Sequence, residues 1–323
     1  MSTVTEVPET YELSGDDAVE TLADSRPDTI AKKAFIRFRY SDGFSFARSL
    51  AFQVVMTLIP GTIFVVALAA LVGEGRLQGI VRTMIESLTP GPAGEMFLAA
   101  FAQGAEAGAQ GDVVAVIAGG TAMLISAVTA MAQLQRGSSR IYGVDGDRTT
   151  LRRYGLATVL ALTAGLLLTV AFVFIALGGS VRSFFDDGLA RLWGWFRWPA
   201  GILALTAGLA TLFKFAPNRR QPGVTWLATG GSVAAVGWVL VSVALSFYLN
   251  ASGTFGDTYG PLAGIVGLAL WAQLSAIAIL YGVAIAAELE AQRAGIEEPH
   301  NDDDTTDEFV DRHIGVQGGL VTA

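Results

Sequence analysis

The stretch SFARSLAFQVVMTLIPG, Ser45–Gly61, begins an apolar run long enough to cross a membrane as a helix. It also departs from the pattern of such a helix. Arg48 stands at its start, and the amide Gln53 follows just inside it. Pro60 and Gly61 then occur where apolar residues are expected to continue. Polar residues and helix breakers are costly within a span, so these positions are functional candidates.

The first run is followed by five others of similar length. Crossing the hydrocarbon core takes about 20 helical residues. Runs of that order occupy Leu50–Val72, Val113–Gln133, Tyr154–Gly178, Trp198–Lys214, Trp226–Leu249 and Pro261–Ala287. They are apolar on all sides, unlike the alternating strands of a membrane barrel, and lipid offers no partner to backbone polar groups. The sequence therefore predicts an all-α, polytopic membrane protein with six transmembrane helices.

Composition and charge agree with this prediction. The chain is 52% hydrophobic and only 15% charged, which lies outside the range of ordinary soluble domains. Sixteen of the 21 Lys and Arg residues fall on one side of the predicted membrane and five on the other. Because cytoplasmic loops carry the excess of Lys and Arg, we expect both termini in the cytoplasm.

Two polar segments flank the membrane part. Residues 1–27 and 294–323 hold 15 of the 29 acidic residues and few large apolar ones. Such a composition cannot bury enough apolar surface to fold, so we expect disordered acidic N-terminal and C-terminal tails. The six-helix membrane domain then covers residues 28–293.

Three amphipathic segments lie outside the spans. Asp28–Phe46 mixes aromatic and basic residues, as an N-terminal helix in the cytoplasmic interface does. After the first span, Glu74–Leu88 places its apolar residues on one helical stripe. A Pro-Gly-Pro breaker separates it from a second such piece, Glu95–Ala107. We expect the last two to form an outer helical hairpin.

Several motifs resemble those of a known family. They are ARSLAFQVVMTLIPG (Ala47–Gly61), LQRGSSRIYGVDGDRTTLRR (Leu134–Arg153), FKFAPNRR (Phe213–Arg220), LSFYL (Leu245–Leu249) and YGPLAGIVGLALWAQLSAIAILYGVAIAAELEA (Tyr259–Ala291). Together they are similar to the YihY/BrkB family of bacterial inner-membrane proteins, over nearly all of Ala31–Ala294. The resemblance implies a six-helix bundle in the bacterial cytoplasmic (inner) membrane.

The resemblance implies less about activity. Names in the family come from serum resistance and from an older ribonuclease label, which we regard as a misassignment. Some members are linked to export of lipids or envelope precursors. This chain departs from the family at Phe52-Gln53, where members often have two tyrosines, and at Ala286–Glu290, which reads AAELE rather than GAELN. A role tied to those tyrosines does not carry over to this chain.

The sequence favours a protein without enzymatic activity. Hydrolytic nucleases need clustered carboxylates or histidines to hold metal ions. The chain has no cysteine and two histidines, His300 and His313, both in the C-terminal tail. It also lacks a Walker or dinucleotide-binding motif. We therefore expect no catalytic residue, metal site or cofactor, and no nucleic-acid partner.

Eight residues are candidates for a cavity or a gate, because polar or helix-breaking residues are costly at membrane depth. They are Arg48, Gln53, Pro60, Gly61, Asn218, Arg219, Gln273 and Glu288. Each also has a structural alternative. Pro60 is also explained as a tolerated kink, and Gln273 as a hydrogen bond to a neighbouring helix. Arg219 is either a topological anchor or a donor to a phosphate or carboxylate at the cytoplasmic face.

Two of these expectations concern geometry. We expect the first span to bend at Pro60, leaving carbonyl oxygens that face protein or water. We also expect an ion pair between Arg48 and Glu288, at the cytoplasmic ends of the first and last spans, with Gln53 one turn deeper. The alternative is that Arg48 reaches lipid headgroups while Glu288 pairs with Arg293 in its own helix.

The architecture and the resemblance favour a transporter or flippase-like exporter of an amphiphilic or lipid-linked molecule, surrounded by membrane lipids. The second class is a non-transporting membrane scaffold or envelope-integrity factor, in which the polar residues only pack. A water-accessible cavity reaching the midplane favours the first class, and a dry, filled bundle favours the second. The sequence leaves the substrate and the oligomeric state open.

Overall fold

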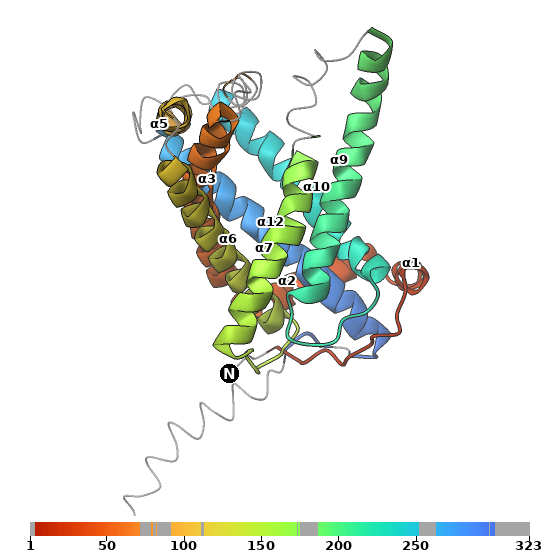
Figure 1. Ribbon diagram of the computed structural model, residues 1–323. Helices are drawn as coiled ribbons and strands as arrows, with labels where there is room; N and C mark the ends of the chain where they lie inside the picture. The colour runs from red at the N-terminus through yellow and green to blue at the C-terminus, as the bar shows by residue number, and fades with distance from the viewer. Residues whose placement is uncertain are drawn as a thin grey trace, which may run out of the picture.

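The computed structural model describes residues 4–71, 79, 82, 92–110, 113–172, 174, 187–251, 263–296 and 298–300. Most of these residues are helical (Figure 1). The helices are α1 (Gly15–Asp24), α2 (Pro27–Tyr40), α3 (Gly43–Leu71), α5 (Pro92–Ala109), α6 (Val113–Ile141), α7 (Thr150–Phe172), α9 (Asp187–Phe215), α10 (Val224–Ala251) and α12 (Ala263–Arg293). Six of them, α3, α6, α7, α9, α10 and α12, are long and apolar enough to cross a membrane. The prediction of an all-α protein with six spans is confirmed.

The six spanning helices form a closed ring. Each packs against the next in the order α3, α6, α7, α9, α10 and α12, and α12 packs back against α3. The other helices lie against this ring, with α2 on α12, α1 on α10 and α5 on α3. Half of the most apolar window of α12 is buried, against 17% for that of α6. The last span is therefore the best-covered element of the ring.

The contact between α10 and α12 depends on small residues. A Cβ added at Gly282 would lie 2.6 Å from both the Ala234 Cβ and the Gly230 carbonyl oxygen. At Gly230 an added Cβ would lie 2.5 Å from the Gly282 oxygen. Small residues let two helix backbones approach closely in lipid, where van der Waals packing drives association. The pair of glycines therefore sets the spacing of α10 and α12.

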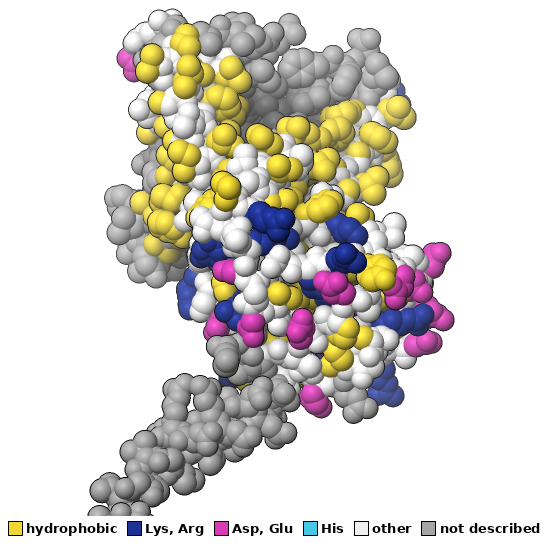
Figure 2. Space-filling view, turned by 60° about the horizontal axis from the view of Figure 1, so that its bottom comes forward, with side chains coloured by type: hydrophobic (Ala, Val, Ile, Leu, Met, Phe, Trp, Pro, Cys, Tyr) yellow, Lys and Arg dark blue, Asp and Glu magenta, His cyan; other side chains and the backbone are white. Residues whose placement is uncertain are grey.

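One end of the ring carries the charged residues, and we call it the basic end. It holds the N-terminal residues, the start of α3, the turn between α6 and α7, the loop between α9 and α10, and the end of α12 (Figure 1). Figure 2 shows Lys, Arg, Asp and Glu side chains gathered over this part of the described surface, beside a mainly hydrophobic belt. A membrane protein is expected to place its charged side chains in the water and headgroup region and its hydrophobic side chains in the hydrocarbon layer.

The largest fully buried side chains gather toward the basic end. In α9 the buried apolar residues lie near its end there, and they are Leu209, Ala210, Leu212 and Phe213. In the other half of α9, Leu192, Trp195 and Phe196 are 69%, 85% and 61% exposed. The long buried stretch of α12, from Leu280 to Ala291, also lies at the basic end. The bundle is closed by side-chain packing at this end, and toward the other end α5 packs against α3, where Val66 and Ala67 are fully buried.

The first predicted helix is interrupted, so the expectation of one helix over Asp28–Phe46 is wrong. Its first part, α2, ends at Tyr40, and α3 begins at Gly43. Asp42 has φ +58°, a left-handed conformation that a continuing helix cannot contain. A Cβ at Gly43 would lie 2.5 Å from the Phe38 ring, so glycine permits the sharp turn.

The N-terminal segment also differs from its prediction. The sequence predicts disorder over residues 1–27, yet residues 4–26 are ordered and contain α1, whose N-cap Ser14 forms a capping box with Asp17. Thr225 at the start of α10 accepts a hydrogen bond from the Gly15 N–H at 3.0 Å. The acidic composition is tolerated because this segment docks on the membrane domain instead of folding alone. Residues 301–323 of the predicted C-terminal tail lie outside the described residues.

Other expectations are met in part. α3 passes through Pro60 without ending, and the bend at that residue stays a prediction. The second piece of the outer hairpin is present as α5. Most of the first piece, Glu74–Leu88, lies outside the described residues, so the hairpin stays a prediction.

Replacing Gly282 with Ala is predicted to destabilise the protein by about 1–3 kcal/mol, because the new methyl group overlaps α10. Thermal unfolding of the purified protein in detergent measures the loss. Gly155→Ala in α7 is the control, since an added Cβ there meets no atom within 4 Å. Equal unfolding temperatures for the two variants would show that the α10–α12 contact tolerates wider spacing.

Candidate functional site

Two buried carboxylates at the end of α12 define the candidate site. Glu288 and Glu290 are 1% and 0% exposed. Residues two apart on a helix point in different directions, so each carboxylate reaches a different neighbour. Buried charges of this kind need partners within the protein.

Arg37 of α2 is the partner of Glu288. Its Nε donates to Glu288 Oε2 at 3.0 Å, and the two side chains are 0% and 1% exposed. The Arg37 Nη1 also donates to the carbonyl oxygens of Thr5, at 2.9 Å, and Ile141, at 3.4 Å. Burial lowers the pKa of Arg37, and the nearby Glu288 carboxylate opposes that shift. One guanidinium thus joins α2, α12, the end of α6 and the N-terminal segment.

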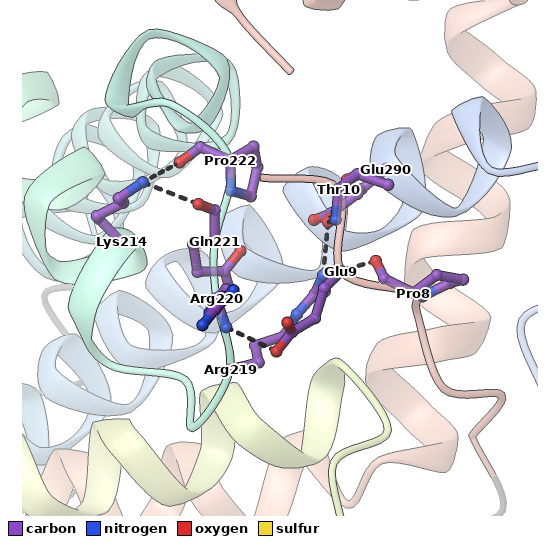
Figure 3. A network of polar contacts seen from close by, with 9 residues as sticks. All are labelled: Pro8, Glu9, Thr10, Lys214, Arg219, Arg220, Gln221, Pro222 and Glu290. Carbon is purple, nitrogen blue, oxygen red and sulfur yellow. Dashed lines mark hydrogen bonds and ion pairs between the residues drawn. The ribbon is translucent and has the colours of Figure 1, made fainter. Parts of the chain in front are cut away.

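Arg219, from the loop between α9 and α10, is the partner of Glu290. Its Nη2 donates to Glu290 Oε1 at 2.6 Å and to the Pro8 carbonyl oxygen at 2.6 Å. The hydroxyl of Thr10 donates to the same Glu290 oxygen at 2.5 Å. The Arg219 guanidinium also lies 4.6 Å from the centre of the Tyr142 ring, a cation–π contact. Figure 3 shows Pro8, Thr10, Arg219 and Glu290 together.

The loop that carries Arg219 is itself held by basic side chains. Arg148 donates to the carbonyl oxygens of Phe215, Ala216 and Pro217 at 3.3, 2.7 and 2.6 Å. Lys214 donates to two further carbonyls of the loop, at residues 221 and 222. These contacts satisfy the exposed end of α9 and fix the position of the loop. Arg219 is therefore presented to Glu290 by a braced backbone.

An extended N-terminal segment, residues 4–13, crosses the basic end over these ion pairs, and we call it the strap. Besides its bonds to Arg37 and Arg219, its Val7 N–H donates to the Tyr142 carbonyl oxygen at 3.1 Å. Gly143 has φ +77°, and a Cβ there would lie 2.6 Å from the Glu6 Cα. Glycine is thus required for the strap to approach so closely.

The predicted pair between Arg48 and Glu288 is not formed. Arg48 lies on an exposed face of α3 and donates to Ser45 Oγ at 3.0 Å. The alternative partner is wrong too, because Arg293 pairs with Asp17 and Glu20 of α1. Glu288 instead faces α2, where Arg37 occupies the buried side of that helix. Its correct partner comes from the interfacial helix and not from the first span.

The other candidate residues lie in two groups. Arg219 is in the site, and Asn218 beside it donates from its side-chain amide to the Gly146 carbonyl oxygen at 2.8 Å. Gln53, Pro60 and Gln273 are half-buried in α3 and α12, away from the basic end.

Gly61 faces α6, where a Cβ at Gly61 would lie 3.5 Å from the side chain of Met123. The structure therefore brings Arg48, Asn218, Arg219 and Glu288 to the basic end and leaves the other four along α3 and α12. The role of all eight in a cavity or a gate stays a prediction.

Sequence reasoning missed Arg37, Glu290, Tyr142 and the strap. Arg37 was detectable, because it lies on the same helical stripe as Ile30, Ala34 and Phe38, the buried residues of α2. An arginine within an apolar stripe indicates a buried partner. The pairing of Arg219 with Glu290 had no comparable signal, since 71 residues separate them.

The family follows from a match over most of the chain. Residues 34–307 match the family described as virulence factor BrkB. The chain belongs to the BrkB family. This BrkB-family chain is 27% identical over 276 residues to the ribonuclease-like protein YfkH of Bacillus subtilis, covering 81% of this chain and 95% of YfkH. No solved structure matches it.

Two further BrkB relatives are UPF0761 membrane proteins. The one from Verminephrobacter eiseniae is 29% identical over 281 residues, covering 83% of this chain and 64% of that protein. The one from Delftia acidovorans is 28% identical over 261 residues, covering 78% and 60%. The present chain thus spans less than two thirds of the length of both. These relatives and the six apolar helices identify a multi-pass bacterial membrane protein.

Replacing Arg37 with Gln leaves the Glu288 carboxylate buried without its ionic partner. We expect a loss of about 3–5 kcal/mol in the free energy of unfolding, because an uncompensated buried charge is costly. The double variant Arg37→Gln/Glu288→Gln is predicted to recover most of that loss, since neither charge remains.

Thermal unfolding in detergent distinguishes these variants, with Arg48→Gln as the matched control. Arg48 is exposed, so its loss is expected to change stability by less than about 0.5 kcal/mol. If Arg37→Gln were as mild as this control, the buried pair would contribute nothing to stability.

Proposed function

We propose that this protein is a transporter or flippase-like exporter of an amphiphilic or lipid-linked molecule. The observation that carries the proposal is the closure of the ring at its basic end. Buried ion pairs and tightly packed helices close that end, and the spans beyond it carry half-buried polar residues, Gln53 and Gln273. A bundle closed on one side by separable contacts is an expected state of alternating access.

The proposal places the basic end in the cytoplasm. The excess of Lys and Arg at that end supports this orientation, because positively charged loops remain inside. The shape described above is then an outward-facing state, in which the buried pairs of Arg37 and Arg219 form the cytoplasmic closure. Opening that side requires both pairs to separate.

The half-buried residues of α3 and α12 are proposed to line the pathway. Gln53 and Gln273 place amide groups on spans that are otherwise strongly apolar. A polar group that is half-buried in lipid is stabilised by meeting water or a polar ligand. Pro60 removes one backbone donor from the same helix, leaving a carbonyl oxygen available to a ligand.

No residue is assigned a catalytic role in this proposal. The ribonuclease-like name belongs to YfkH, and the proposed cargo is an amphiphile and not a nucleic acid. The alternative function is a non-transporting membrane scaffold or envelope-integrity factor. One observation favours that alternative, because the buried ion pairs also fix a static bundle.

Orientation is tested by fusing a reporter that is active only in the cytoplasm. Activity is expected after Arg148 or Arg293, at the basic end, and none after Gln110, at the other end of the ring. Both of the first two positions lie on the side of the membrane that holds 16 of the 21 Lys and Arg residues, and the side with that excess remains inside. Activity after Gln110 and none after Arg148 would invert the orientation.

Transport is tested by lipid profiling of a deletion strain, with the inner-membrane leaflets resolved by a membrane-impermeant reagent. One amphiphilic species is expected to accumulate on the cytoplasmic side, and the intact gene is expected to reverse this. Gln273→Leu is expected to insert normally and fail to restore the distribution, because it removes the amide from the pathway. Gln103→Leu, at an exposed position of α5, is the control.

An unchanged lipid distribution in the deletion strain would refute the transport proposal. Full restoration of the envelope by Gln273→Leu would favour the scaffold instead.

A further inference from the structure

The strap meets the site through its own oxygen atoms. The Arg37 Nη1 donates to the Thr5 carbonyl at 2.9 Å, and the Arg219 Nη2 donates to the Pro8 carbonyl at 2.6 Å. The backbone N–H of Arg220 donates to the Glu9 carboxylate at 2.9 Å. Figure 3 shows Pro8 and Glu9 facing the loop of Arg219 and Arg220. Three oxygens from one segment therefore occupy donors presented by α2 and the loop.

Further buried donors at the site have no hydrogen-bond partner among the described residues. They are Arg37 Nη2 and Arg219 Nε and Nη1. One acceptor of the same ion pairs, Glu290 Oε2, is in the same condition. Guanidinium groups have no acceptor atom, so donors outnumber acceptors in this cluster. Such an excess of donors matches a group that only accepts, such as a phosphate or a carboxylate.

Tyr142 lies beside both arginines. The Arg219 guanidinium is 4.6 Å from the centre of its ring, and the Arg37 Nη1 donates to the carbonyl oxygen of Ile141, the preceding residue, at 3.4 Å. Tyr142 is fully buried, and burial raises the pKa of its phenol. The phenol thus remains protonated and able to donate at cellular pH.

Charge also favours an anion once the strap is absent. Inside the site the charges balance, because Arg37 pairs with Glu288 and Arg219 pairs with Glu290. The exposed side chain of Arg220 adds one positive charge at the edge of the site. The strap then adds three acidic residues, Glu6, Glu9 and Glu12, and no basic one. Its presence both fills the donors and reverses the local charge.

We infer that the strap covers a binding site for an oxyanion, the phosphate or carboxylate of an anionic ligand, and that strap and ligand compete for it. The ligand's oxygens replace those of Thr5, Pro8 and Glu9 on the arginine donors. The inference deepens the proposed function by naming an anionic headgroup as the feature of the cargo that is recognised. The strap is then an internal stand-in for that headgroup.

Displacement of the strap exposes residues that are now buried. Val4 and Val7 are 6% and 1% exposed. The chain has no cysteine, so Val4→Cys supplies a single thiol whose maleimide labelling reports strap release. Val7→Cys is a second reporter in case Val4→Cys does not fold. Ala157→Cys, at a buried site in α7, is the control for general loosening.

The full-length variants are placed in lipid nanodiscs, and labelling rates are measured with two probes. One is inorganic phosphate in phosphatidylcholine discs, and the other is phosphatidylglycerol in the discs. At least tenfold faster labelling of Cys at position 4 is expected, with saturation, and no change at position 157. Acceleration by phosphate alone identifies a free oxyanion, and acceleration only by phosphatidylglycerol identifies a lipid headgroup.

A matched pair of strap variants tests the competition. Glu9→Gln removes the carboxylate that occupies the Arg220 N–H, so it is expected to lower the half-saturating phosphate concentration about three- to tenfold. Glu12→Gln removes the same charge from the strap without touching that donor and is expected to have less effect. Equal effects would show that only the charge of the strap matters and would overturn competition at this site.

Two other outcomes would overturn the inference. One is labelling that neither probe accelerates, and the other is equal acceleration by chloride or by phosphatidylcholine alone. These results are independent of the transport test. Strap release without transport would refute the proposed function and leave the binding site in place, whereas transport without strap release would do the reverse.

Discussion

Two carboxylates on the last helix must be neutralised inside the protein, and the basic end is organised around that requirement. Glu288 and Glu290 are almost completely buried, and each is met by one arginine from a different part of the chain. Removing an ion from water costs several kcal/mol even after relaxation, so such a pair persists only with good geometry and further hydrogen bonds. The carbonyls of the strap supply those bonds to both arginines.

The same constraint explains why distant segments meet at this end. The turn at Asp42 folds α2 back so that Arg37 reaches α12, and the bracing of the loop by Arg148 directs Arg219 toward Glu290. Close contact of α10 and α12 at Gly230 and Gly282 then holds the last helix in place. In the proposed transport cycle the two ion pairs open together, because they share the strap.

The sequence predicts the membrane architecture well and the site only in part. The spans are long apolar runs, and lipid leaves a helix as their only structure, so hydropathy is sufficient. Local conformation is harder, because the break at Asp42 depends on one left-handed residue beside a glycine. The pairing of Arg219 with Glu290 depends on how helices assemble, which spacing along the chain does not encode. The strap was missed because its acidic composition is typical of disorder, whereas its contacts are made mainly by backbone atoms.

Distance measurements between spin labels would test most directly whether the ion pairs close one side of a moving protein. Labels at Phe44 and Val224 report the basic end, and labels at Val114 and Phe247 report the other; all four residues are exposed, and the chain has no native cysteine. Neutralising Arg219 and Glu290 together is predicted to lengthen the first distance and shorten the second in a subpopulation. Unchanged distributions at both ends would contradict the account and indicate a static bundle.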